Sequence, residues 1–147
     1  SSEEFVKKSR ESFDSVINEL GFTKEQVREI SKNESDIVQL KNESVKVKIS
    51  ESAIEGKGVF ATSEIDDGEC IGLARVNGKR TIFGRYVNHS IEPNARMFAL
   101  ENGDVLLIAT KKINGSLGGM PGDEITIDYK QAYFEGIKFK QGVLCHT

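Results

Sequence analysis

The hydrophobic periodicity of the chain changes near Ser44, and this change limits the folds that it can adopt. Before that point apolar residues recur at helical spacing, whereas beyond it they alternate with polar residues, as in half-buried strands. The later apolar segments are short and are bounded by turn residues, without regular alternation of strands and helices. A doubly wound α/β fold needs that alternation, so the pattern predicts a mostly β domain preceded by helices.

Two helices are predicted in the first 43 residues. Residues 3–20 have the spacing of an amphipathic helix, and Gly21 is placed to end it in a left-handed cap. A second, short helix is expected to begin at Thr23, because Gln26 completes a capping box with it. The apolar residues expected to face inward are Phe13, Val16, Ile17, Leu20, Val27 and Ile30.

Short strands separated by turns are predicted after residue 44. Asn77-Gly78 and the Glu-Asn-Gly-Asp segment at 101–104 carry hairpin turn signals. Residues 114–122 are rich in glycine and are expected to form a loop. The expected strands cover residues 45–49, 59–61, 69–76, 95–100, 105–109 and 124–127.

The composition limits the size of the fold and the kind of partner. A chain of 147 residues fits one domain with a single core. The formal net charge of −3 and the pI near 5.5 argue against direct nucleic-acid binding. They favour a basic partner, such as a lysine-containing protein or peptide, and they leave the oligomeric state unknown.

Targeting signals and metal-ligand spacing are both missing from the sequence. No apolar run approaches the roughly 20 residues needed to cross a bilayer, and the polar start shows no signal peptide. We therefore expect an intracellular, cytoplasmic protein that does not contact a membrane. The two cysteines, Cys70 and Cys145, are too few for a disulfide framework or a four-ligand zinc site. Reduced thiols and no bound metal are expected.

Three separated segments carry the functional signal: Gly56–Phe60, Arg85–Asn94 and Gly122–Tyr129. In this order they resemble the motifs G-x-G-x-F, R-[FY]-x-N-H-S-x-x-P-N and G-x-E-[IL]-T-x-D-Y of the SET-domain protein lysine methyltransferases. Single short motifs recur by chance, so the signal lies in having all three in order. The resemblance covers residues 45–130 and is to the small viral and microbial members that lack a cysteine-rich segment after the core.

The resemblance implies a mostly β SET fold, which is β-clip-like and is built of several small sheets with a knot-like C-terminal crossing. The expected organisation is a helical extension (1–43), the SET domain (44–130) and a C-terminal segment (131–147) that closes the lysine and cofactor site. An aromatic side chain is expected to form this closing wall. The candidates are Tyr133, Phe134 and Phe139.

The resemblance also implies S-adenosyl-L-methionine as the cofactor. In the family the glycine loop holds the cofactor through main-chain groups, and this role carries over to Lys57, Gly58 and Val59. The side chain of Asn88 would contact the methionine moiety, since an amide offers donors and an acceptor to a zwitterion. The main chain of His89 would contact adenine.

Tyr129 matches the catalytic tyrosine of the family, and the knot-like crossing would bring it close to Asn88. The implied reaction transfers the sulfonium methyl group to the ε-amine of a protein lysine, and this displacement needs no covalent enzyme intermediate. The site would have to align the reacting atoms and favour the deprotonated amine in a narrow apolar channel. Asp123 and Glu124 are expected as turn and scaffold residues, and Arg85 is expected to be structural.

Two other functions stay open at the level of the sequence. One is a catalytically idle SET-fold interaction module that retains cofactor binding, and the other is methylation of an acceptor other than lysine. Ile127 stands where relatives often have Phe or Tyr that influences the number of methyl groups, so no degree of methylation is predicted. Many relatives bind zinc after the core, but only Cys145 lies in that region here.

Overall fold

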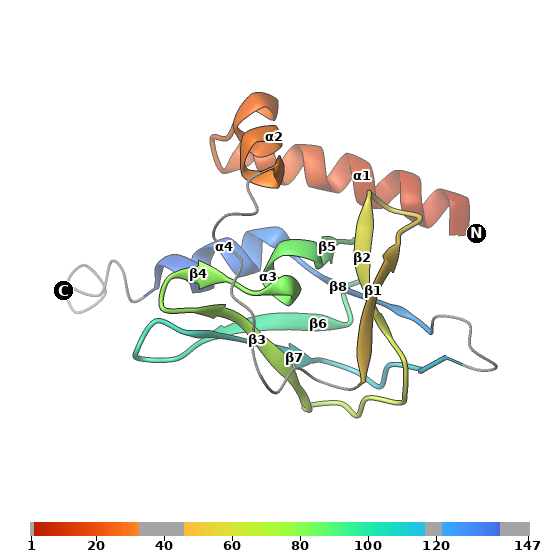
Figure 1. Ribbon diagram of the computed structural model, residues 1–147. Helices are drawn as coiled ribbons and strands as arrows, with labels where there is room; N and C mark the ends of the chain where they lie inside the picture. Colours follow the sequence, from red (N-terminus) through yellow and green to blue (C-terminus); the bar gives the residue numbers. More distant parts are fainter. Residues whose placement is uncertain (1, 33–45, 117–121, 139–147) are drawn as a thin grey trace.

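Two four-stranded sheets form the body of the molecule, and two N-terminal helices lie across one side of it (Figure 1). The computed structural model describes residues 2–32, 46–116 and 122–138. This arrangement confirms the predicted mostly β fold with helices outside it. The helices are α1 (Ser2–Glu19), α2 (Lys24–Lys32), α3 (Ile82–Tyr86) and α4 (Tyr129–Ile137).

The local signals at the two N-terminal helices are confirmed. Gly21 takes a φ of +83° after α1, and the amide of Phe22 donates to the carbonyl of Ile17 at 3.0 Å, as in a Schellman cap. Before α2, the amide of Thr23 donates to Gln26 Oε1 at 2.7 Å, and Thr23 Oγ1 accepts from the Gln26 amide at 3.0 Å. These two caps fix the sharp turn between α1 and α2.

The apolar side of α2 faces a cavity instead of a packed core. Val27 is partly buried and Ile30 is 49% exposed, so the expectation that both would pack inward is only half met. The helix is held instead at its C-terminal end. There Arg80 and Arg85 donate to the carbonyls of Ile30 and Ser31, where cations complement the helix dipole.

Each sheet contains strands that are distant in sequence. The first has the order β1-β2-β8-β5, and the second has the order β4-β3-β7-β6. The two predicted hairpin turns are present: Asn77-Gly78 has positive φ at both residues and joins β3 to β4, and Gly103 (φ +92°) lies between β6 and β7. The strands are β1 (Val47–Glu51), β2 (Lys57–Ala61), β3 (Cys70–Val76), β4 (Lys79–Arg80), β5 (Asn88–His89), β6 (Ala95–Ala99), β7 (Val105–Ala109) and β8 (Glu124–Ile127).

The Asn-His segment and the C-terminal motif meet in a parallel pairing between β5 and β8. Asn88 is opposite Thr126, and His89 is opposite Ile127. Asn94 extends this contact through its side chain, since its Nδ2 donates to the Glu124 carbonyl and its Oδ1 accepts from the Thr126 amide, both at 2.9 Å. The Asn-His segment and the C-terminal motif are thereby held side by side.

Two helices, α3 and α4, were not predicted. Thr81 caps α3 by accepting from the amides of Phe83 and Gly84, and a helix of five residues is too short to show a 3.6-residue period. The helix α4 lies along the edge strand β6, where Gln131 both accepts from the amide and donates to the carbonyl of Met97. The side chain thus satisfies backbone groups that an exposed edge would leave open.

The core lies between the two sheets and the connections that join them. Its fully buried side chains include Val59, Leu107 and Ile125, one from each of three strands. None of the helices in the described part of the chain is long and apolar enough to cross a membrane. Residue 45, residues 117–121 of the predicted loop, and Phe139 and Cys145 lie outside the described residues.

Two helical glycines give a matched test of how closely α3 packs on β3. A Cβ on Gly84 would lie 2.1 Å from the carbonyl oxygen of Ala74, whereas a Cβ on Gly136 would meet nothing within 4 Å. We expect Gly84→Ala to lower the free energy of unfolding by about 2 kcal/mol. Gly136→Ala should raise it by up to about 1 kcal/mol. Urea denaturation measures both, and equal effects would contradict the proposed close packing.

Candidate active site

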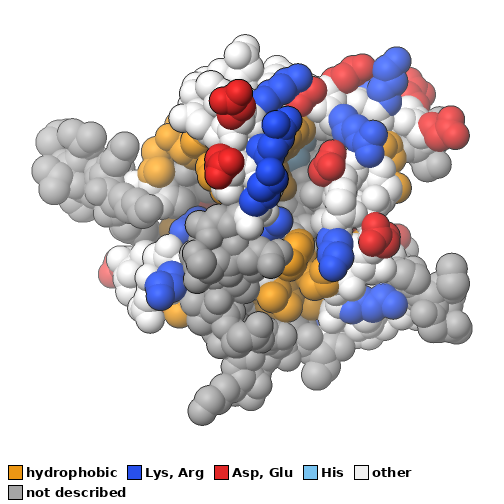
Figure 2. Space-filling model, turned by 45° about the horizontal axis from the view of Figure 1, so that its top comes forward, with side chains coloured by type: hydrophobic (Ala, Val, Ile, Leu, Met, Phe, Trp, Pro, Cys, Tyr) orange, Lys and Arg blue, Asp and Glu red, His pale blue; other side chains and the backbone are white. Residues whose placement is uncertain are grey.

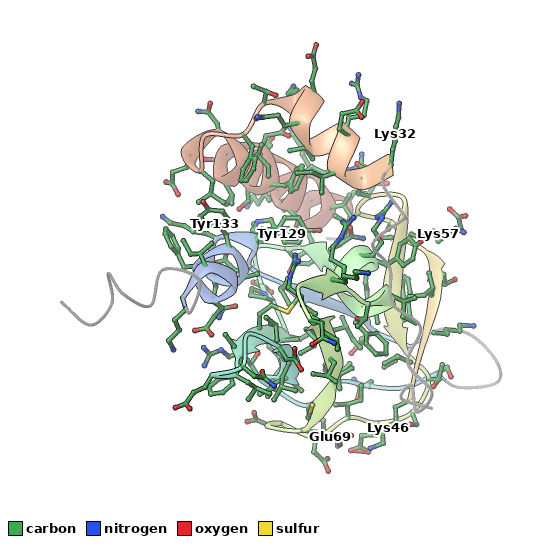
Figure 3. All side chains as sticks on the ribbon, turned by 60° about the vertical axis from the view of Figure 1, so that its left-hand side comes forward. Lys32, Lys46, Lys57, Glu69, Tyr129 and Tyr133 are labelled. Carbon is green, nitrogen blue, oxygen red and sulfur yellow. The ribbon has the colours of Figure 1, made fainter. Side chains whose placement is uncertain are left out.

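A cavity of about 780 Å³ lies between the N-terminal helices and the segment around β5. Its walls come from α1, α2, the turn between β1 and β2, α3, β5 and α4. Figure 3 shows Tyr129 and Tyr133 beneath α1, with Lys57 on the side of β2, while Lys46 and Glu69 lie at the far end of the molecule. The volume is typical of a site for a small organic ligand.

Residues of all three motifs meet at this cavity. Of the six site residues predicted from the sequence, Lys57, Asn88, His89 and Tyr129 line it. Gly58 and Val59 are not among its lining residues, and Val59 is fully buried in the core. The glycine loop therefore reaches the cavity through residues 55–57.

The amide of Asn88 is oriented by the protein around it. Its Nδ2 group lies near four acceptors: Glu124 Oε2 at 2.8 Å, the carbonyl of Glu55 at 3.0 Å, Ser52 Oγ at 3.1 Å and the carbonyl of Lys57 at 3.3 Å. An amide has only two N–H protons, so these acceptors saturate them. No described residue donates to its Oδ1, so this oxygen is the group that Asn88 has left for a ligand.

Glu124 is the residue that holds this orientation. Its Oε1 accepts from Ser52 Oγ at 2.7 Å, while its Oε2 accepts from Asn88. Burial raises the pKa of the Glu124 carboxyl, and the hydrogen bonds from Ser52 and Asn88 oppose that rise by favouring the carboxylate. From the sequence, Glu124 was expected only as a scaffold residue, because its spacing from Asn88 along the chain says nothing about their contact.

Gly58 is required by this network. A Cβ at that position would lie 2.3 Å from Glu124 Oε2 and 3.2 Å from Asn88 Nδ2. From the sequence, a glycine was expected here so that the main chain could approach a ligand. In the structure, the side chains that a Cβ on Gly58 would meet are those of Glu124 and Asn88.

His89 is buried between α1 and α4. Its Nδ1 accepts from the Tyr129 amide at 3.0 Å, and its Nε2 is 2.9 Å from Ser12 Oγ. Burial lowers the pKa of the imidazole, and the partly exposed carboxylate of Asp128, 4.0 Å from Nδ1, opposes this in part. The imidazole is therefore neutral at neutral pH.

The phenol of Tyr129 is held at the base of the cavity. Its hydroxyl donates to the carbonyl of Val87 at 2.7 Å, and its ring contacts those of Phe13 and His89, each at a centroid distance of 5.4 Å. Burial of the hydroxyl strongly raises the pKa of Tyr129, although nearby Arg85 lowers it somewhat. The phenol therefore keeps its proton at neutral pH.

The charged groups around the cavity are mainly cationic. Among the described lining residues, five carry a positive charge and Glu55 alone carries a negative one. Figure 2 shows a row of Lys and Arg side chains, with Asp and Glu beside it, on the face that carries the N-terminal helices. Among the described residues, buried Arg85 Nε has no hydrogen-bond partner. Such a donor is costly to bury unless a ligand uses it. The positive lining residues are Arg10, Lys57, Arg75, Arg80 and Arg85.

Of the aromatic candidates for a closing wall, Tyr133 is the one that lines the cavity. Its ring packs edge-on against Phe22 at 5.9 Å. Phe134 is 53% exposed and is not a lining residue, and Phe139 lies outside the described residues. No group of three or more potential metal ligands occurs in the described ranges.

Sequence reasoning missed the part that α1 plays in this site. Ser9 is fully buried and accepts from the Ile91 amide at 3.2 Å, and Ser12 contacts His89. The available signal was the spacing of Ser9, Ser12 and Phe13, which places two serines on the apolar side of the helix. Ser52 carried no comparable signal.

The family model for the SET domain matches residues 73–130. A solved structure of a candidate histone methyltransferase from Plasmodium falciparum is similar at 20% sequence identity, with a TM-score of 0.41. That match covers 60% of this chain and 96% of the other. No curated protein matches the chain. Residues 73–130 are thus similar to the SET domain, the domain of a methyltransferase family, and two of the three motifs lie within the matched range.

A double-mutant cycle tests the packing of Gly58 against Glu124. We expect Gly58→Ala to cost about 1–3 kcal/mol of stability, because its Cβ displaces the carboxylate. In a Glu124→Ala background the same change should cost clearly less, since the clashing atoms are gone. Urea denaturation of the four proteins gives the coupling energy. Strict additivity would show that Glu124 does not impose the glycine.

The pH dependence of stability tests the state of His89. Its pKa lies below the ordinary value of 6.5, so between the two values the unfolded chain binds more protons. The stabilisation from the neutral imidazole is therefore complete above 6.5 and is lost as pH falls through the folded value. His89→Gln lacks this titration, so its stability deficit should shrink between about pH 7.5 and about pH 5.5. A constant deficit in urea denaturation would contradict a depressed pKa.

Proposed function

We propose that this protein is an S-adenosylmethionine-dependent methyltransferase that modifies the ε-amine of a lysine in a protein substrate. The observation that carries the proposal is the meeting of Lys57, Asn88 and Tyr129, one from each motif, around a single cavity. The SET-domain match supports methyl transfer as the class of reaction. The choice of lysine rests on the family resemblance and on the chemistry of the cavity.

The residues at the cavity fit the amino-acid end of the cofactor. Asn88 presents only its Oδ1, which can accept from an ammonium group. The buried Nε of Arg85 lacks a partner among the described residues and would be satisfied by a carboxylate. Glu55, Gly56 and Lys57 bring main-chain groups to the same space. An α-amino acid supplies both charges, whereas a simple anion would leave Asn88 without a donor.

When bound, the cofactor supplies a methyl group on a positively charged sulfur. The hydroxyl of Tyr129 donates its proton to the Val87 carbonyl. The lone pairs of the phenol oxygen therefore remain available to accept from the reactants. Those lone pairs can orient the incoming amine and accept weak C–H contacts from the methyl group. Its raised pKa keeps the phenol neutral, so Tyr129 positions the amine and does not remove its proton.

The apolar part of the cavity would favour the deprotonated form of the substrate lysine amine. A lysine ammonium has a reference pKa of about 10.4, and both desolvation and an adjacent positive charge lower it. The side chains of Ile17, Ile54 and Val87 help to line the cavity, and the nearby arginines add positive charge. The neutral amine would thus be favoured before it reaches Tyr129. Tyr133 is the aromatic group that we assign to the closing wall over this space.

Removing one hydroxyl tests the role of Tyr129. We expect Tyr129→Phe to lower the rate of methyl transfer by at least about tenfold, because the amine loses its orienting acceptor. Affinity for S-adenosylhomocysteine, measured by calorimetry, should change by no more than about threefold, since the cofactor contacts are assigned elsewhere. The assay follows labelled methyl transfer to a pool of basic proteins, with mass spectrometry to locate the label.

Tyr133→Phe is the matched control, because it removes a hydroxyl from the same cavity without touching the Val87 contact. It should keep most of the activity. Equal rates in the Tyr129 variant and the wild type would remove this residue from the mechanism. Cofactor binding without any transfer by the wild type would instead favour the idle interaction module, and label on another acceptor would refute lysine specificity.

A further inference from the structure

The imidazole of His89 links two helices that are far apart in the sequence. On one side its Nδ1 meets the amide of Tyr129, the first residue of α4, at 3.0 Å. On the other side its Nε2 meets Ser12 Oγ of α1 at 2.9 Å. With 4% exposure, the ring has little access to water that could replace either partner.

The partners of His89 determine where its proton lies. A backbone amide can only donate, so Nδ1 must offer its lone pair to Tyr129. The single proton of the neutral ring is then on Nε2 and points to the Ser12 hydroxyl, which accepts it. Asp128 is 4.0 Å from Nδ1, but its carboxylate already accepts from the Lys130 amide at 2.9 Å. Ser12 is thus the described partner of the Nε2 proton.

Tyr129 is held at two points by the segment from Val87 to His89. Its amide donates to the His89 ring, and its hydroxyl donates to the Val87 carbonyl at 2.7 Å. The position of the phenol therefore depends on the position of the imidazole. A small rotation of the ring would weaken the first bond and shift the start of α4.

One face of α1 contacts His89, the residues just after it and Tyr129. Ser9, Ser12 and Phe13 follow helical spacing. Ser9 accepts from the Ile91 amide, Ser12 contacts the His89 ring, and Phe13 packs edge-on against Tyr129. Without His89 as its partner, the hydroxyl of Ser12 would lie unpaired on the apolar face of α1, and this would destabilise the fold.

We infer that α1 is part of the active site, and that Ser12 is a positioning residue that holds Tyr129 through His89. The inference deepens the proposed function, on which its catalytic meaning rests. Its structural part stands on the contacts alone. Ser12 fixes the ring, the ring holds the amide of Tyr129, and the phenol is kept beside the Val87 carbonyl.

Hydrogen exchange tests the contact without requiring activity. In Ser12→Ala the amide of Tyr129 should exchange about three- to tenfold faster, the effect of one net hydrogen bond. The buried Leu107 amide of β7 serves as the reference for global opening. Ser12→Thr keeps the hydroxyl and should restore protection, and Ser15→Ala, at an exposed position of α1, should leave it unchanged. Equal Tyr129 protection in all variants would overturn the inference.

Two further readouts separate positioning from simple loss of stability. In Ser12→Ala the turnover number should fall about three- to tenfold, with the Kd for S-adenosylhomocysteine changed by no more than about twofold. Nitrogen-15 NMR of the side chain should show the His89 proton on Nε2, and a proton on Nδ1 would overturn the inference. A wild type that transfers no methyl group would refute the proposed function, and with it the catalytic part of this role, even if exchange responds as expected.

Discussion

The parallel pairing of β5 with β8 is the interaction on which the rest of the site depends. These strands are short, and their contact is reinforced by the side chain of Asn94 and by the buried bond between the Ser90 and Thr126 hydroxyls at 2.6 Å. Because of this pairing Asn88 lies beside Glu124, and His89 lies beside Tyr129. Without it, the motif residues would share no cavity.

Two polar atoms at the cavity, Asn88 Oδ1 and Arg85 Nε, have no hydrogen-bond partner among the described residues. The protons of the Asn88 amide are taken up by Glu124, Ser52 and two carbonyls, whereas its oxygen is left open. The Nε–H group of Arg85 is a donor that has no acceptor among the described residues. This acceptor and this donor would suit the ammonium and the carboxylate of the proposed cofactor.

The N-terminal helices act as more than a cover over the sheets. α1 contacts the Asn-His segment and Tyr129, while α2 is fastened by Arg80 and Arg85 to the same body. The helix α1, which lies within the predicted extension 1–43, therefore contributes side chains to the cavity. Residues of α1 line the cavity, and Ser12 and Phe13 of this helix contact His89 and Tyr129.

Local chemistry was sufficient to predict much of the fold. The capping box at Thr23, the left-handed turn at Gly21, the Asn77-Gly78 hairpin and the alternating strands each depend on neighbouring residues, and each is present. The motif order also predicted the similarity to the SET domain over residues 73–130, and four of the residues it named, Lys57, Asn88, His89 and Tyr129, line the cavity. Only the tertiary structure decided that Glu124 and Ser52 orient Asn88, that Gly58 makes room for Glu124 and Asn88, and that Ser12 meets His89. Those contacts join residues thirty or more positions apart. No local preference of the backbone or spacing along the chain encodes which distant side chains will share one buried space.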